Sequence, residues 1–270
     1  MIGLFLSIRI RWSWLAVVLV LAVAGVWRFS TLPRHPIEHP IDTPVTSGVR
    51  DFPIFYYKTT EKKMALTFDI SWGEKEPMRV LDVLKSANQK ATFFLSSPWS
   101  QKHPDVVKAL VDAGMEIESH GNAHINLDQA TVQQITDNVD SAHQVLVQLS
   151  GQTPTFLRPP NGAYDDAVVD TLKALNYETV IWSIDSLDWK NPGVGYMVQR
   201  VSREAFPGAI ILFHASDSAK QTADALPQVL ATLKSQGYQL VTLRELAKLG
   251  PPMRDDPRGR PQKPNQASTS

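Results

Sequence analysis

The chain has 270 residues, 43% of them hydrophobic and 20% charged, which allows one large globular domain with a substantial core. Basic and acidic residues number 27 each, so the zero formal net charge gives no reason to expect a nucleic-acid partner. The absence of cysteine excludes disulfide frameworks, thiolate nucleophiles and cysteine-ligated zinc sites.

An apolar stretch follows two arginines near the start of the chain. Arg9 and Arg11 precede Trp12–Trp27, a run that is almost wholly apolar and close to the shortest length of a membrane-spanning helix. Positive charge before such a run is typical of a secretion or insertion signal, and it places the bulk of the chain outside the cytoplasmic membrane. We expect residues 1–30 to be an uncleaved membrane anchor, with secretion after cleavage near Ala24 as the alternative.

Polar segments that contain proline flank the central part of the chain. Residues 31–54 hold five prolines and bury too little apolar surface to order themselves, so we predict a linker there. Residues 251–270 are polar and contain prolines, and we predict a disordered tail. One folded domain is therefore expected over residues 55–250.

Within this domain, short apolar runs alternate with helical patterns. Strands are predicted at Met64–Ile70, Ala91–Leu95, Met115–Ser119, Thr155–Leu157, Thr179–Ile184, Ala209–Phe213 and Gln239–Leu243. Helices are predicted at Pro77–Ala87, Pro104–Ala113, Thr131–Leu149, Asp165–Leu175, Val194–Glu204 and Ala223–Ser235. This alternation predicts a parallel sheet covered by helices, and it leaves open whether the sheet is a barrel or an open doubly wound sheet.

Two histidines stand four residues apart, just after one predicted strand. If the chain turns helically there, His120 and His124 point to one side at a separation that suits one divalent metal ion. The same spacing also suits two surface histidines on a loop. The residues at the neighbouring strand ends distinguish a metal site from a pair of surface histidines.

Chemistry in a parallel α/β fold collects at the carboxyl ends of the strands. The residues found there are Asp69, His120, His124, Arg158, Asp185, Asp188 and His214. Each one alone has a structural explanation, such as a helix cap or a surface ion pair. Together at successive strand ends, they outline a hydrolytic metal site.

Five stretches in this order resemble the motifs of a known family, the polysaccharide deacetylases (the NodB-homology domain of carbohydrate esterase family 4). The stretches are Thr67-Phe68-Asp69, Ser119-His120-Gly121-Asn122-Ala123-His124, Arg158-Pro159-Pro160-Asn161-Gly162, Asp185-Ser186-Leu187-Asp188-Trp189 and Leu212-Phe213-His214. The resemblance covers residues 62–249 and implies a distorted (β/α) barrel of about seven parallel strands with outer helices.

The resemblance also implies an activity and its residues. Members hydrolyse N-acetyl groups on amino-sugar polymers with a divalent metal ion, commonly zinc. By position, the metal ligands are His120 and His124, the general base is Asp69, and the general acid is His214. Arg158 would orient Asp69, and Asp188 would orient His214.

Three further residues match the family's substrate-binding positions. The backbone N–H of Asn161 would face the oxyanion of the tetrahedral intermediate. Trp189 and Leu212 would form the apolar pocket for the acetyl methyl group.

The first motif departs from the family pattern. Members usually have a second aspartate, a metal ligand, where this chain has Ile70. Either Asp69 or Glu74 supplies the third ligand instead, or the metal is bound weakly or is absent. The Asp69-Ile70-Ser71-Trp72-Gly73 variant is similar to the sporulation-associated branch, whose members are anchored at the N-terminus and act on spore peptidoglycan.

We therefore expect metal-dependent N-deacetylation of peptidoglycan-type polymers, in spore or cell-wall maturation. The alternatives are a glycan-binding module of weak or no activity and an O-acetyl esterase. The expected partners are the amino-sugar polymer and the cytoplasmic membrane, not nucleic acid, and we expect a monomer.

Overall fold

The structure, a computed structural model, describes residues 51–259. These residues belong to the second of the two units into which the chain divides, Met1–Val45 and Thr46–Ser270. The expected membrane anchor, most of the expected linker and residues 260–270 lie outside the described residues. Within residues 51–259, no helix has the length and apolar character needed to cross a membrane.

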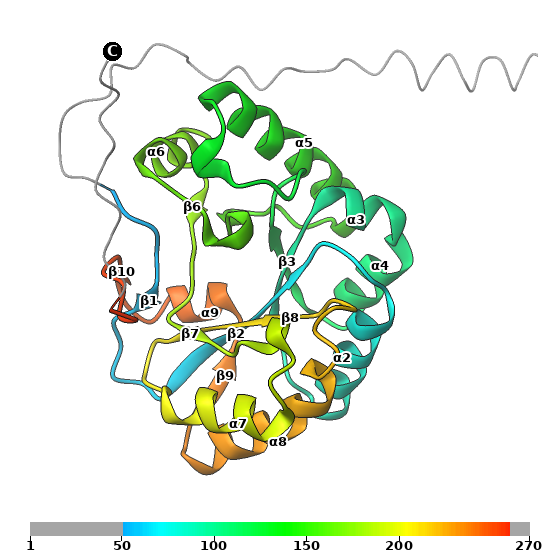
Figure 1. The fold of residues 1–270 in the computed structure, drawn as a ribbon, viewed down its shortest axis with the longest axis vertical. Coiled ribbons are helices and arrows are strands. Elements are labelled where there is room, and N and C mark those ends of the chain that lie inside the picture. Colours follow the sequence, from blue (N-terminus) through cyan, green and yellow to red (C-terminus); the bar gives the residue numbers. More distant parts are fainter. Residues whose placement is uncertain (1–50, 260–270) are drawn as a thin grey trace, which may run out of the picture. The chain divides into compact units, whose positions relative to one another are not determined.

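In the described part of the chain, eight strands form one parallel sheet. Its central strand is β2 (Lys63–Ile70), which Figure 1 shows with β3 (Thr92–Leu95) and β8 (Ile210–His214) beside it. One side of β2 continues through β3, β4 (Glu116–Ser119), β5 (Phe156–Leu157) and β6 (Glu178–Thr179). The other side continues through β8 and β7 (Ile184–Asp185), and β9 (Gln239–Val241) pairs with the start of β2. The predicted parallel sheet is thus confirmed.

The predicted single strand over residues 179–184 is wrong, because two short strands occupy this stretch. β6 pairs with β5, whereas β7 pairs with β8, so the partner changes along the stretch. Between them, Ile181 O accepts a hydrogen bond from Arg158 Nη2, and Ser183 Oγ accepts one from Ile210 N. The result is an incomplete (β/α) barrel in which residues 178–185 reach from one side of the sheet to the other.

Helices cover the outside of the sheet (Figure 1). The six predicted helices are found as α2 (Lys75–Ser86), α4 (Pro104–Asp112), α5 (Val132–Ser150), α6 (Asp166–Ala174), α7 (Val194–Arg203) and α8 (Thr222–Ser235). A capping box of Thr131 and Gln134 starts α5, as the Thr131 boundary predicted.

Two short helices and a small second sheet were not predicted. They are α3 (Ser97–Lys102), α9 (Leu243–Ala247), and strands β1 (Tyr56–Tyr57) and β10 (Pro252–Met253), which pair in antiparallel fashion. Thr242 caps α9, so the strand expected through Leu243 ends at Val241. Pro252 and Met253, which we expected in the disordered tail, are ordered by pairing with β1.

The alternation of side chains along β2 separates the core from the site. Phe68 and Ile70 point outward into the main hydrophobic cluster with α2, α4 and α8, where Phe68 stacks on Phe93 at 5.0 Å between ring centroids. Thr67 and Asp69 point to the opposite face, because successive side chains alternate along a strand. Asp69 therefore lies inside the barrel at its carboxyl end, and Ile70 does not.

Candidate active site

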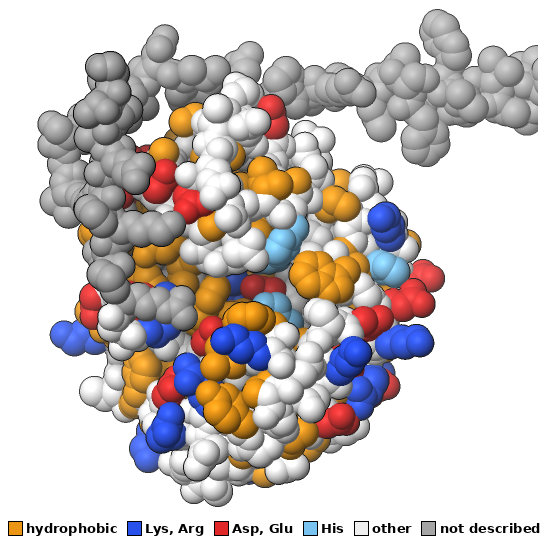
Figure 2. Space-filling model, viewed as in Figure 1, with side chains coloured by type: hydrophobic (Ala, Val, Ile, Leu, Met, Phe, Trp, Pro, Cys, Tyr) orange, Lys and Arg blue, Asp and Glu red, His pale blue; other side chains and the backbone are white. Residues whose placement is uncertain are grey.

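A pocket of about 450 Å³ opens at the carboxyl ends of the strands. Figure 2 shows histidine and acidic side chains together in a hollow of this face, with hydrophobic side chains around them. Seven predicted site residues line the pocket: Asp69, His120, His124, Asn161, Trp189, Leu212 and His214. The fold brings these residues together from positions up to 145 apart in the sequence, since Asp69 and His214 end adjacent strands.

Asp69 is held by a fully buried arginine. Arg158 Nη1 donates a hydrogen bond of 2.7 Å to Asp69 Oδ1, and its guanidinium lies 4.1 Å from the centre of the Phe94 ring. Burial alone would raise the pKa of Asp69, but the charges of Arg158 and the nearby histidines outweigh burial and hold that pKa below its usual range. Asp69 is therefore ionised at neutral pH, as a general base requires.

His120 and His124 lie together, although the chain does not turn helically between them. Gly121 adopts φ +79°, and a Cβ there would lie 2.4 Å from Asn138 Oδ1. Asn138 holds the loop by accepting from the backbone N–H of Asn122 and donating to the carbonyl of Ala123. The two imidazole centroids are 5.4 Å apart, so a glycine turn gives the proximity expected of a helix.

Both imidazoles are prepared to act as neutral nitrogen ligands. His120 Nδ1 donates to the Arg158 carbonyl at 2.7 Å, which leaves Nε2 as the basic nitrogen, 3.9 Å from Asp69 Oδ2. Burial lowers the pKa of His120 to about 4 and also lowers the pKa of His124. An imidazole anchored through Nδ1 and neutral at Nε2 is the usual form of a metal-binding histidine.

The third ligand is not supplied where the sequence suggested. Ile70 is buried in the hydrophobic cluster, and the Glu74 carboxylate lies 3.4 Å from His103 Nδ1, outside the pocket lining. Across residues 51–259, no three histidine, aspartate or glutamate side chains are grouped as a metal site. The two histidines could supply two ligands of a divalent ion, and the Asp69 carboxylate lies beside them, with its Oδ2 3.9 Å from His120 Nε2.

The surroundings of His214 favour its positively charged form, whereas those of Asp69 favour its negatively charged form. Its Nδ1 donates to Asp188 Oδ1 at 2.8 Å, and Asp188 Oδ2 accepts from the His214 backbone N–H and from Thr222 Oγ1. Burial alone would lower the pKa of His214, but the Asp188 carboxylate outweighs burial and raises that pKa. The protonated form of His214 is therefore more stable than that of a free imidazole, and Nε2 is the nitrogen left to donate a proton in the pocket.

Asn161, Trp189 and Leu212 complete the predicted set. Asn161 adopts a left-handed conformation, φ 59°, and its side chain donates to Asn126 Oδ1 at 2.8 Å. Leu212 is buried at the pocket wall, whereas Trp189 is half exposed at its rim.

Sequence reasoning missed three residues that line the pocket, namely Trp72, Trp182 and Ser218. Asp185, which was predicted at a strand end but given no role, also lines the pocket. Trp72 lies beside the Ile70 departure, the one signal in the sequence that pointed to it. Ser218 follows β8 in a loop whose polar composition resembles any surface turn.

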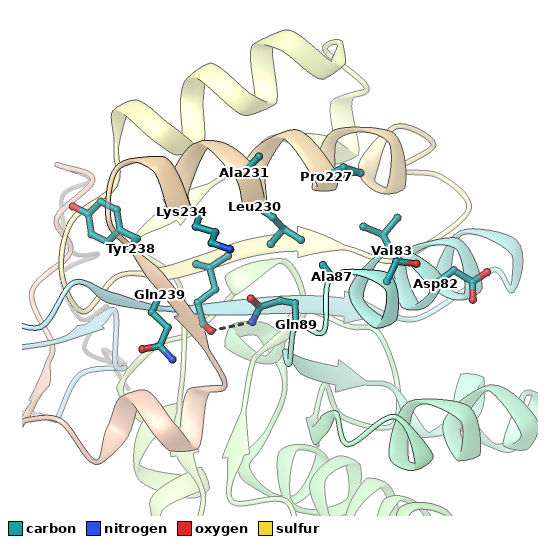
Figure 3. Close-up of a pocket in the computed structure, with 12 residues that line it drawn as sticks. Asp82, Val83, Ala87, Gln89, Pro227, Leu230, Ala231, Lys234, Tyr238 and Gln239 are labelled. Carbon is teal, nitrogen blue, oxygen red and sulfur yellow. Dashed lines mark hydrogen bonds between the residues drawn. The ribbon is translucent and has the colours of Figure 1, made fainter.

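A larger hollow, of about 800 Å³, lies between α2, α8 and β9 (Figure 3). Its charged lining groups are Asp82 and Lys234, and its Gln89 amide already donates to the carbonyl of Leu240. This lining contains no histidine and no pair of carboxylates. The residues suited to hydrolysis lie in the smaller pocket.

Comparison with known proteins agrees with the motifs. Residues 56–180 match the family model described as polysaccharide deacetylase. The chain is 32% identical over 243 residues to the peptidoglycan-N-acetylmuramic acid deacetylase PdaA of Bacillus subtilis, covering 84% of this chain and 92% of that protein. It is 35% identical over 187 residues to a peptidoglycan-N-acetylglucosamine deacetylase of Listeria monocytogenes, which covers 69% of this chain but 39% of the longer relative.

A solved structure extends the comparison to the fold. The crystal structure of a pseudoenzyme of carbohydrate esterase family 4 from Bacillus anthracis superposes with a TM-score of 0.69 at 32% identity, over 74% of this chain and 69% of that chain. A solved structure of Bacillus subtilis PdaA, a family 4 carbohydrate esterase, superposes with a TM-score of 0.67 at 32% identity, over 73% of this chain and 85% of that chain. The chain belongs to the polysaccharide deacetylases of carbohydrate esterase family 4.

Proposed function

We propose that this protein hydrolyses N-acetyl groups on peptidoglycan-type amino-sugar polymers. The observation that supports the proposal most directly is that Asp69, whose pKa is lowered, and His214, whose pKa is raised, line the same pocket. Groups whose surroundings push their pKa values apart are suited to be base and acid of one reaction. The names of the relatives supply the substrate class.

In the proposed reaction, Asp69 takes a proton from a water molecule, whose oxygen attacks the acetamide carbonyl. His214 Nε2 then gives its proton to the sugar nitrogen as the C–N bond breaks, which releases acetate and a free amine. Arg158 favours the ionised form of Asp69, and Asp188 favours the protonated form of His214. The Asn161 backbone N–H would stabilise the oxyanion, and Leu212 and Trp189 would enclose the acetyl methyl group.

We propose that His120 and His124 hold a divalent metal ion, with zinc the expected one. Such an ion supplies polarisation of the acetamide carbonyl and a lower pKa of the attacking water. Two histidine ligands with no dedicated carboxylate predict weaker binding than a site with three protein ligands provides. Members of this family generally depend on metal, and the proposal extends that dependence to this chain.

The setting of the proposed activity follows from the sequence. The arginines before the apolar run favour an anchor in the cytoplasmic membrane, with the domain outside and a role in spore or cell-wall maturation. We also propose that the protein acts as a monomer.

A specific observation favours a second function, glycan binding without turnover. Ile70 stands in place of the expected metal ligand, and one relative of the same fold is a pseudoenzyme. In that case the pocket would bind the polymer without cleaving the amide. An O-acetyl esterase would use the same residues and differ only in its leaving group.

One experiment separates these functions. The full-length protein, in detergent, is incubated with N-acetylated peptidoglycan and with O-acetylated peptidoglycan, after addition of zinc, cobalt or nickel, and acetate is measured. The proposed function predicts acetate from the N-acetylated polymer, lost in Asp69→Asn and His124→Ala. Polymer binding without acetate release from any substrate would contradict it and support the binding module. Release from the O-acetylated polymer alone would indicate the esterase.

A further inference from the structure

Two large aromatic side chains remain exposed at the rim of the pocket. Trp72 is 47% exposed and Trp189 is 49% exposed, and both line the pocket with the proposed acid and base. Exposed aromatic rings are costly in water and are frequent where a protein contacts a ligand. Trp189 matches a family motif, whereas Trp72 belongs to the segment in which this chain departs from that motif.

The Trp72 ring is fixed by its neighbours. Its Nε1 donates to Ser218 Oγ at 3.0 Å, and its ring packs edge to face with His124, with centroids 5.4 Å apart and planes at 72°. A ring held in this way loses little conformational freedom when a ligand binds against it.

The backbone on either side of Trp72 is also held. Gly73 has φ +85°, and a Cβ there would lie 2.5 Å from the Asp217 carboxyl carbon, so only glycine allows this loop to dock on the loop after β8. Trp99 Nε1 donates to the Gly73 carbonyl at 2.6 Å. Asp217 in turn accepts from the backbone N–H of Glu76 at 2.8 Å.

A polar bridge connects the two tryptophans. Ser218, which accepts from Trp72, offers its carbonyl to Asn191 Nδ2 at 2.8 Å, and Asn191 follows the short helix Asp188–Lys190 that carries Trp189. Lys190 Nζ lies 4.8 Å from the centre of the Trp189 ring, so one face of that ring is covered. Among the described residues, no cation lies over the Trp72 ring, so its exposed surface is open to a ligand.

The size and chemistry of this rim suit a sugar ring. A pyranose has faces of C–H groups that pack on aromatic surface and a rim of hydroxyls that stays in water. A pocket of about 450 Å³ exceeds the volume of an acetamide and falls within the range of small-ligand pockets. In this pocket, the buried polar side chains such as Asp69 and His214 suit the amide, and the exposed rings of Trp72 and Trp189 suit the sugar.

We propose that Trp72 is a sugar-positioning residue, which packs against the ring of the unit whose acetamide enters the pocket. The inference rests on the proposed function for its substrate class. Trp72 acts by fixing the ligand and takes no part in proton transfer. It distinguishes this chain from family members whose first motif has no tryptophan at this point.

The test measures binding and turnover separately in the full-length protein with a pentamer of N-acetylglucosamine. Binding is measured by calorimetry after removal of metal with a chelator, and KM and kcat by acetate release after zinc is restored. Trp72→Ala is expected to raise both Kd and KM about tenfold, as the loss of one well-packed aromatic contact predicts, while kcat falls less than about threefold. Trp72→Tyr should recover most of the affinity.

Two further variants serve as matched comparisons. Ser218→Ala keeps the indole but removes its hydrogen bond, and it should weaken binding by less than Trp72→Ala does. Tyr196→Ala removes an aromatic ring that is 45% exposed on α7 and absent from the pocket lining, so it should leave binding unchanged. Thermal unfolding of each variant checks that the fold is retained.

The outcomes distinguish this inference from the proposed function. Unchanged Kd in Trp72→Ala, or a loss of kcat with KM unchanged, would overturn the role of Trp72 in holding the sugar. If the wild-type protein binds the pentamer through Trp72 but releases no acetate from the pentamer or from N-acetylated peptidoglycan, the inference stands and the proposed function fails.

Discussion

Asp69 and His214 are direct register partners on the adjacent parallel strands β2 and β8. Each is held by its own partner, Asp69 by Arg158 and His214 by Asp188, and the pKa values of the two residues are shifted in opposite directions while both line one pocket. The sheet register sets the position of the base relative to the acid, and the two ion pairs shift their pKa values. The contribution of each ion pair can be tested by its own substitution.

The Asp188 carboxylate should set the alkaline limit of activity. His214 must be protonated to act as the acid, and Asp188 raises its pKa, so wild-type activity should persist to higher pH than a free imidazole allows. Asp188→Asn removes the charge and lowers that pKa, so the alkaline limb of the kcat/KM profile should move to lower pH. Asp112→Asn, on the exposed face of α4, is the control and should not move it. An unshifted limb in Asp188→Asn would show that His214 is not the acid.

Arg158 should support both the acid limit of activity and the stability of the barrel. Because Arg158 holds the pKa of Asp69 down, Asp69 stays ionised in the folded protein until the pH falls through that lowered value. The stability contributed by this pair is fully present above the pKa of an unfolded aspartate and is lost as the pH falls from there through the lowered value. Arg158→Met would leave a buried carboxylate unpaired, raise its pKa and lower the free energy of unfolding by about 3–5 kcal/mol. Urea unfolding and the acid limb of the pH–rate profile measure the two effects.

A matched arginine tests whether this cost comes from burial. Arg203 is 71% exposed and lies 4.0 Å from Glu204, so Arg203→Met should change the free energy of unfolding by less than about 1 kcal/mol. Equal destabilisation by the two substitutions would contradict the buried ion pair as the source of the effect.

The sequence predicts the parts of this protein that depend on local pattern. The continuous apolar run of β2 identified a buried parallel strand, and Asp69 at its end marked the edge where the site forms. The prediction of one strand over residues 179–184 was wrong. The chain there pairs first with β5 and then with β8, and this change of partner depends on residues far away in the sequence.

The same limit explains the candidate metal ligands. The position of Glu74 depends on Asp217 and His103, which contact the start of α2 from other parts of the chain. His120 and His124 were expected to meet through a helical turn, and they meet through Gly121 and Asn138 instead. Trp72 joins the pocket only because Ser218 and the loop after β8 lie beside it.

Metal removal should abolish activity without unfolding the protein. The histidines line a pocket on a preformed barrel, and His120 is fixed by the Arg158 carbonyl independently of any ion. A chelator is therefore expected to eliminate acetate release while leaving the thermal midpoint within a few degrees, unlike a structural zinc site whose loss unfolds the domain. Added zinc should restore the wild-type protein but not His120→Ala. Full activity after exhaustive chelation would contradict a role for the metal.

Gly121 should be essential to the site because of its surroundings as well as its backbone angle. Gly121 and Gly151 both have positive φ, +79° and +68°, so alanine at either strains the backbone by about 1–2 kcal/mol. A Cβ at Gly121 would also lie 2.4 Å from Asn138 Oδ1, whereas a Cβ at Gly151 would have no atom within 4 Å. Gly121→Ala should therefore displace the loop between the two histidines and lower activity at least about tenfold, whereas Gly151→Ala should lower only stability. Acetate release and urea unfolding, measured on both variants, separate the loop's function from simple backbone strain: equal activity in the two would show that Asn138 does not position the histidines.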